Sequence, residues 1–165
     1  MITIGFLELN SISKGILAAD EMIKAADIAL IAARPSCPGK YQILITGEVS
    51  SVEAALDAGQ AASSSNVIDR LILPRIHPQV VEAINMSSAP ERLRALGVME
   101  FFSVTAAILA ADAAAKAADV DLLEIRLGTG IGGKSFVTMT GDVSAVTASV
   151  DAGIKSAEGT GMVLD

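Results

Sequence analysis

The sequence is poor in the residues on which several classes of function depend. Its 165 residues include no tryptophan, one tyrosine, four phenylalanines, one histidine and one cysteine. Acidic side chains outnumber basic ones by 19 to 12, which gives a formal net charge of −7. Nucleic-acid-binding proteins use excess positive charge and aromatic stacking surfaces. The composition therefore argues against nucleic acid as a partner.

Long apolar runs are also missing, although 52% of the residues are hydrophobic. The longest uncharged stretches, such as residues 101–111, fall well short of the roughly 18 apolar residues that a membrane-spanning helix needs. The amino terminus reads M-I-T-I-G-F-L-E-L and has no basic segment before its apolar residues, unlike a secretory signal. We therefore expect no membrane partner and a cytoplasmic location.

The chain repeats itself at an offset of 92 residues. The stretch G-F-L-E-L-N-S-I-S-K-G-I-L-A-A-D from Gly5 realigns on G-V-M-E-F-F-S-V-T-A-A-I-L-A-A-D from Gly97. After a two-residue insertion in the second copy, G-K-Y-Q-I-L-I-T-G-E-V-S from Gly39 matches G-K-S-F-V-T-M-T-G-D-V-S from Gly133. Self-similarity over this distance indicates a tandem duplication.

Each copy has the pattern of a small α/β domain. In the first copy, four segments have the composition of strands and two have that of helices, namely strands at 3–9, 28–33, 41–47 and 67–74 and helices at 11–26 and 49–62. The order β-α-β-β-α-β is that of the ferredoxin-like fold, an antiparallel sheet with both helices on one face. A short helix is expected from Pro78, because proline suits the first helical position.

The predicted fold class is therefore α/β (α+β), with two tandem ferredoxin-like domains at residues 1–92 and 93–165. Domains of this size with many alanines and few aromatics have thin cores. We therefore expect other subunits to cover much of their apolar surface.

The two copies differ most in one loop, R-P-S-C-P-G-K at 34–40 against R-L-G-T-G-I-G-G-K at 126–134. The second version matches the phosphate-binding pattern G-x-x-x-x-G-K-[ST]. Such a loop needs a helix directly after it, so that backbone N–H groups face the anion. Here the following F-V-T-M-T-G-D alternates as a strand does. We interpret the loop as a glycine-rich turn, suited to a pore or ligand mouth, and keep a nucleotide-hydrolysing enzyme as a minor alternative.

Cys37 lies in the corresponding loop of the first copy, beside a predicted tight turn at Pro38 and Gly39. Taken by itself, one thiol favours a structural residue, because metal sites usually show several ligands in one chain. If the loop lies on a threefold axis, three copies of Cys37 would supply three thiolates to a cubane iron–sulfur cluster. The nearby Arg34 and Lys40 would favour the thiolate form.

The remaining polar residues do not form a catalytic arrangement. Lys24 and Lys116 occupy equivalent helix ends, where a cation complements the helix dipole. His77 has no nucleophile or second base near it in the sequence, which favours a turn residue. Glu8 and Glu100 are duplicated within strands, where they would pair structurally or face an interface rather than act as acid and base. The sequence predicts that the protein is not an enzyme.

Several blocks of residues resemble the bacterial microcompartment (BMC) domain family, specifically its tandem-domain shell proteins. They are G-F-L-E-L-N-S-I-S-K-G, D-E-M-I-K-A-A-D-I-A-L, C-P-G-K-Y and the repeated T-G-E-V and T-G-D-V. The two loops are most similar to those of the iron–sulfur-bearing shell proteins of propanediol-utilisation microcompartments. The resemblance implies a homotrimer whose six domains form a pseudohexameric tile. Such tiles join other shell proteins in a shell around metabolic enzymes, so the implied function is structural.

The resemblance also implies roles for individual residues. Cys37 of each chain would bind one iron–sulfur cluster per trimer, of the 4Fe-4S type, for electron transfer across the shell to an encapsulated redox enzyme. Neighbouring loop residues would line the central pore, namely Ser36, Cys37, Pro38, Gly39, Gly130, Ile131 and Gly132. Lys24, Lys116 and Arg75 would lie at tile edges. Ile76 replaces a proline of the family's P-R-P-H segment, so we expect altered edge geometry there.

One further function fits part of the pattern. A duplicated ferredoxin-like regulatory module could bind a small ligand at a domain interface. This alternative accounts for the fold and for the glycine-rich loop, but it does not explain the single cysteine or the paired lysine positions.

Overall fold

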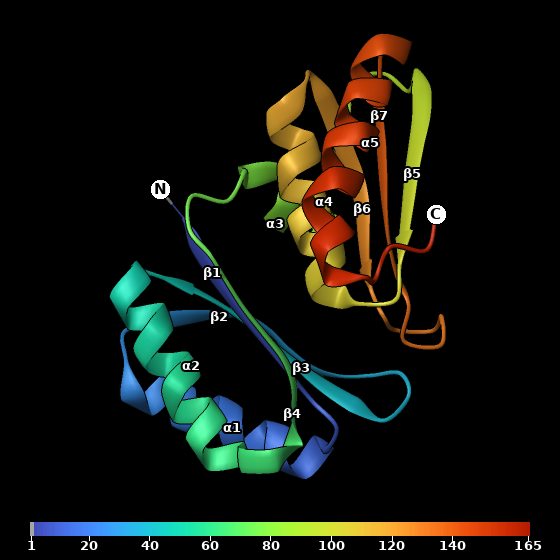
Figure 1. Ribbon diagram of the computed structural model, residues 1–165. Coiled ribbons are helices and arrows are strands. Elements are labelled where there is room, and N and C mark those ends of the chain that lie inside the picture. Colours follow the sequence, from blue (N-terminus) through green and yellow to red (C-terminus); the bar gives the residue numbers. More distant parts are fainter. Residues whose placement is uncertain (1) are drawn as a thin grey trace. The chain divides into compact units, whose positions relative to one another are not determined.

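The structure is a computed structural model that describes residues 2–165. The chain forms two compact units, one ending at Ile76 and one beginning at His77. Both are α/β units with an antiparallel sheet (Figure 1). No helix within residues 2–165 is both long and apolar enough to cross a membrane.

The first unit has the ferredoxin-like order expected from the sequence. Its sheet has the strand order β2-β3-β1-β4, and every neighbouring pair is antiparallel. Both helices lie on one face of this sheet (Figure 1). The elements are β1 (Thr3–Leu9), α1 (Ile12–Ala25), β2 (Ile28–Ser36), β3 (Lys40–Gly47), α2 (Val49–Ser63), a 3-10 turn (Ser64–Asn66) and β4 (Val67–Leu73).

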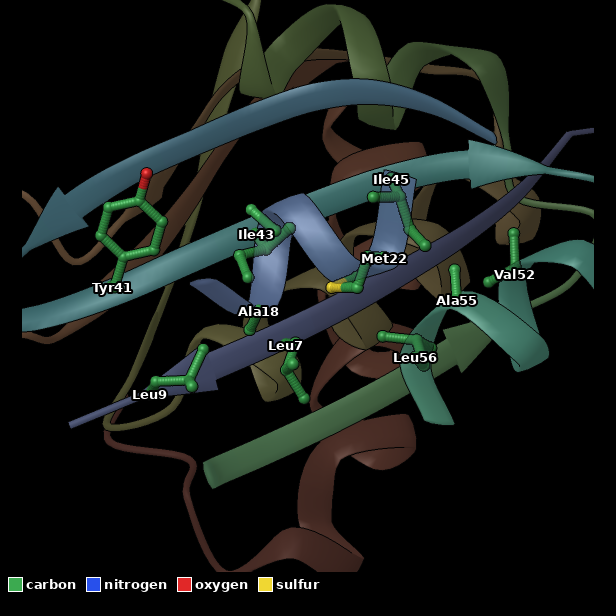
Figure 2. Packing of buried hydrophobic residues seen from close by; sticks show 11 residues of the cluster. Leu7, Leu9, Ala18, Met22, Tyr41, Ile43, Ile45, Val52, Ala55 and Leu56 are labelled. Carbon is green, nitrogen blue, oxygen red and sulfur yellow. The ribbon is translucent and has the colours of Figure 1, made fainter. Parts of the chain in front are cut away.

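Side chains from two strands and both helices form the core of the first unit. Leu7 and Ile43 point from β1 and β3 toward the helices, where Met22 of α1 and Leu56 of α2 meet them (Figure 2). All four are fully buried. Gly59 of α2 permits the contact between the helices, because a Cβ there would lie 2.7 Å from the Met22 side chain.

The second unit repeats the first, but its sheet has three strands in the order β5-β7-β6. Helices α4 and α5 cover one face (Figure 1). After α5, Val163 pairs with Phe101 at the end of β5 through an isolated bridge. The elements are α3 (Pro78–Ile84), β5 (Ala95–Phe101), α4 (Val104–Ala117), β6 (Val120–Leu127), β7 (Ser135–Gly141), α5 (Val143–Ala157) and a 3-10 turn (Glu158–Thr160).

Both copies start their first helix in the same way. The hydroxyl of Ser11 accepts a hydrogen bond from the Lys14 backbone N–H, and Ser103 accepts one from Ala106. These contacts satisfy a backbone donor that the first helical turn leaves free. The capping serine that the sequence suggested at residue 11 is confirmed.

The short helix α3 packs on the second unit rather than on the first. It lies against β6 and α4, and the Leu122 backbone N–H donates to Gln79 Oε1 at 2.8 Å. The division after Ile76 therefore differs from the boundary at residue 92, which follows the sequence repeat. The sequence repeat shows where the second copy begins to resemble the first. It does not show which unit residues 77–92 pack against.

Candidate functional site

The first candidate loop is a tight hairpin between β2 and β3. Its turn consists of Cys37, Pro38 and Gly39, with Ser36 buried at the end of β2. Cys37 is a half-buried free thiol, while Pro38 and Gly39 are exposed. Gly39 has a φ of +75°, a conformation that L side chains rarely adopt. The turn therefore places one thiol at the tip of the hairpin.

An ion pair joins the base of this hairpin to the central strand. Lys40 Nζ lies 3.0 Å from Glu8 Oε2, and the Gln42 side-chain amide donates to Glu8 Oε1 at 3.1 Å. Glu8 is almost fully buried, so its charge requires such partners. Lys40 is the first residue after the turn, and its pairing fixes the start of β3 to β1.

The second candidate loop joins β6 to β7 and is glycine-rich. Gly128, Gly130, Gly132 and Gly133 all have φ between +68° and +83°. A strand follows at Ser135, and no helix begins there, so backbone N–H groups are not presented by a helix N-terminus. The expected glycine-rich turn is confirmed. The phosphate-binding interpretation of this motif fails because a strand, rather than a helix, follows the loop.

The base of the second hairpin repeats the ion pair of the first. Lys134 Nζ lies 2.5 Å from Glu100 Oε1, the counterpart of the pair at Glu8. Here both side chains are more than one third exposed, and Phe136 takes the place of the glutamine. The guanidinium of Arg126 lies 5.7 Å from the Phe136 ring centre and also pairs with Glu124. The duplicated carboxylates of the strands thus anchor the two hairpins.

The donor set of one chain fits a metal cluster only in part. Within residues 2–165, no group of three or more His, Cys, Asp or Glu side chains could hold a metal ion. Cys37 offers one sulfur at an accessible turn, so a cubane cluster would require thiolates from other chains. One cysteine per chain is the donor set expected if several copies of the chain each supply one thiolate to a shared cluster.

The predicted edge residues lie away from the hairpins in sequence and remain solvent-accessible. Lys24 and Lys116 each pair with the aspartate one turn earlier, Asp20 and Asp112, at 2.5 Å. The hydrogen bond that Lys24 donates to the Asp20 carboxylate raises the pKa of Lys24 above its ordinary value. Arg75 is exposed in the left-handed region, with a φ of +55°. These contacts leave each cation on the surface of its own unit.

The structure adds a difference between the copies that sequence reasoning missed. Ile16 of α1 is 56% exposed, whereas the equivalent Ile108 of α4 is fully buried. The sequence carries a signal of this, since Lys14 and Glu21 of α1 are replaced by Ala106 and Ala113 in α4. A helix without those charges is better suited to burial on several sides.

The exposure of apolar residues on the two sheets differs in the opposite direction, with the more exposed residues in the second copy. Val98 of β5 is 51% exposed, whereas the equivalent Phe6 of β1 is fully buried. Leu96 and Ile4 show the same contrast. The more exposed apolar residues thus belong to the helix in the first unit and to the sheet in the second.

Comparison with known proteins shows which family has this repeated architecture. The model of the BMC domain matches twice, over residues 3–76 and 95–165. The chain belongs to the BMC domain family. It is 38% identical over 161 residues to the bacterial microcompartment shell protein PduT of Citrobacter freundii, an alignment covering 98% of this chain and 88% of that protein.

Solved structures agree with this assignment. A microcompartment protein from Desulfitobacterium hafniense is 51% identical, with a TM-score of 0.95 over all of this chain and 92% of that one. The fused permuted hexameric shell protein MSM0275 has the same fold, with a TM-score of 0.69 at 22% identity over 95% of this chain and 81% of its own. The family and the tandem fold predicted from the sequence are confirmed. This BMC-domain chain is a microcompartment shell protein, with a structural rather than an enzymatic role.

Proposed function

We propose that this BMC-domain chain forms a homotrimer whose six domains make a pseudohexameric shell tile. The observation that carries the proposal is the paired contrast in exposure between the two units. An open helix face at one end of the chain and an open sheet face at the other can join head to tail. An association of this kind buries both faces in every copy when the ring closes.

The two open faces are chemically complementary. Large apolar side chains at 40% exposure or more lie along α1, namely Ile12, Ile16, Leu17 and Ile23. On the second unit, Leu96 and Val98 of β5 are exposed in the same way, beside Phe102. Contiguous apolar surface of this kind is typical of subunit interfaces. We infer that α1 of one copy covers the open face of β5 in the next.

A charge-swap experiment tests the ring. Val98→Glu and Ile16→Lys should each reduce trimer to monomer or dimer in native mass spectrometry, because each places one unpaired charge in an apolar interface. The double variant carries opposite charges on the two faces of each chain and should recover the trimer. A trimer that survives both single changes would refute this interface.

Within the trimer, we assign the two hairpins to the central pore. Ser36, Cys37, Pro38 and Gly39 would alternate around the axis with Gly130, Ile131 and Gly132 of the second hairpin. Three copies of Cys37 would then offer three thiolates to one 4Fe-4S cluster. A bound cluster would supply one-electron chemistry across the shell, and the chain's own residues would position the thiols through the Glu8–Lys40 anchor.

The cluster has its own test, separate from the ring. Protein purified without oxygen should show by native mass spectrometry a trimer with the added mass of one cluster, and Cys37→Ser should lose the iron and keep the trimer. Full iron content in that variant would refute the assignment. A trimer without metal in the unaltered chain would leave the tile proposal standing and make Cys37 a pore-lining thiol.

We further place Lys24, Lys116 and Arg75 at the tile edges, where they would contact other shell proteins. All three are accessible in the isolated chain. Substituting Lys24 and Lys116 with alanine should leave the trimer intact and prevent the extended sheets that electron microscopy would show for the unaltered protein. Loss of the trimer instead would place these lysines within the ring.

A further inference from the structure

Each unit has a cavity at the end of its sheet opposite to the hairpin. The two cavities are equivalent in the repeat, because each lies where the second strand of its unit begins and the third strand ends. In the first unit the cavity has a volume of about 420 Å³, and its lining includes Ile2, Asp27, Ile28 and Glu48. In the second unit the volume is about 650 Å³, and the lining includes Arg94, Asp119 and Asp142.

The second cavity already contains a bound cation. The guanidinium of Arg94 donates to Asp142 Oδ1 at 2.9 Å, and the Arg94 backbone N–H donates to Thr140 Oγ1 at 2.8 Å. Asp142 is the N-cap residue of α5, but its side chain makes no capping hydrogen bond. Its carboxylate therefore binds the guanidinium instead of the helix.

The first cavity keeps the acids and lacks the cation. Asp27 and Glu48 are the counterparts of Asp119 and Asp142, whereas Ile2 stands where the second unit has its arginine. Glu48, like its counterpart, is an N-cap residue whose side chain does not cap its helix. Within residues 2–165, neither Asp27 nor Glu48 has an ion-pair partner.

The charges around the first cavity favour a cation. Asp27 directly follows Ala26, the C-cap residue of α1, and the last carbonyls of a helix carry partial negative charge. Lys24 precedes them in the same helix, but it pairs with two acids of α1. Two carboxylates without counterions on the walls of one cavity raise the local concentration of cations.

The lining also selects the class of cation. Ile2 and Ile28 form an apolar wall, which suits an aliphatic stem that keeps its charged end beside the acids. A metal ion fits poorly, because no group of three or more His, Cys, Asp or Glu side chains in the described part of the chain could hold one. In the second unit, the cation at the repeated position is the guanidinium of Arg94, whose planar donors match a carboxylate.

We propose that the first cavity binds a guanidinium cation on an apolar stem between Asp27 and Glu48, and that Arg94 is the built-in occupant of the corresponding cavity in the second unit. A free guanidino compound and an arginine side chain of another copy of the chain share this chemistry. The site goes beyond the tile and does not depend on it, because all of its lining residues belong to the first unit.

The direct probe is arginine blocked at both ends, N-acetylarginine methylamide. Titrated into the isotope-labelled full chain, it should shift the amide resonances of residues 27–29 and 46–48 in a saturable way. The amide of Asp142 should not respond, because Arg94 fills that cavity. The matched control is the same compound with citrulline in place of arginine. Citrulline has the same length but a neutral urea group, so it should bind at least about fivefold more weakly.

Chain variants test the site from the side of the protein. Ile2→Arg supplies from within the chain the cation that the first cavity lacks, so it should prevent binding of the probe. Ile2→Met has similar length and no charge, and it should leave binding unchanged. Ile2 is 44% exposed, so the fold should tolerate either side chain. Glu48→Gln removes one of the two charges and should weaken binding about threefold.

The titration is run on the unaltered chain and on its Val98→Glu variant, so that failure of the ring and failure of the cation site are distinguishable. Saturable binding in both chains supports the site and identifies a free guanidino compound as its ligand. Binding in the Val98→Glu variant alone also supports the site, and shows that an arginine of another copy fills it in the assembly. The absence of saturable shifts in both chains, equal binding of the citrulline compound, or unchanged binding to the Ile2→Arg chain would overturn the proposal.

Discussion

The contact between Gly15 and Tyr41 offers a sharp test of how the first hairpin is anchored. A Cβ on Gly15 of α1 would lie 2.4 Å from Cγ and Cδ1 of the Tyr41 ring, well inside the 3.0 Å that real contacts respect. Tyr41 follows Lys40 on β3, and its side chain is only 8% exposed. The change Gly15→Ala therefore forces the ring, or the helix, to move.

Two opposing terms set the expected magnitude. Overpacking a close-packed core costs about 1–3 kcal/mol, while alanine stabilises a helix interior by about 1 kcal/mol relative to glycine. The clash involves ring atoms next to the backbone rather than a flexible side-chain end, so we expect it to prevail. The difference is a net loss of up to about 2 kcal/mol, which lowers the melting temperature by up to roughly 8 °C for a chain of this size.

The second unit supplies the matched control. At the equivalent positions it has Ala107 and Ser135, so the larger helix residue there faces a smaller strand residue. Thermal unfolding should be compared at one protein concentration, because assembly alters apparent stability. In a Tyr41→Ser background, Gly15→Ala should raise the melting temperature. A rise in the unaltered background as well would refute the packing argument.

Two further predictions concern charged contacts. Glu8→Gln should destabilise the protein by about 1–3 kcal/mol, because it removes a hydrogen-bonded buried charge. Glu100→Gln should cost at most about 1 kcal/mol, because the pair of Glu100 with Lys134 is more than one third exposed. Equal losses of unfolding free energy in chemical denaturation would contradict this difference. The pKa of Lys24 is raised by Asp20, so its stabilising effect is complete below the ordinary lysine pKa and disappears as pH rises through the elevated value. In an NMR titration, Asp20→Asn should lower that pKa, and an unchanged value would exclude the hydrogen bond as its cause.

Local pattern was sufficient to predict the elements of the first unit. The strand at residues 3–9 and the helix capped by Ser11 occur where expected, because alternation and capping chemistry act over a few residues. The turn at Gly130 was also predictable, since the strand-like residues after it exclude a phosphate loop. In both places the local preference and the tertiary structure agree.

Tertiary choices were not predictable in the same way. The short helix at Pro78 was expected, but only the contacts of Gln79 and Ser88 with Leu122 show which unit it joins. A seven-residue helix has too few residues to be stable without such packing. The bridge between Phe101 and Val163 in the second unit is likewise a tertiary contact that the repeat alone does not indicate.

The divergence of the copies has a physical consequence for assembly. Most residues of helix α4 are buried, and its alanines at 106 and 113 replace charges that burial would penalise. Helix α1 keeps Lys14 and Glu21 beside its exposed isoleucines, which favours solubility of the chain before it meets another copy. We therefore infer that the duplication allowed one helix to specialise for folding and the other for association.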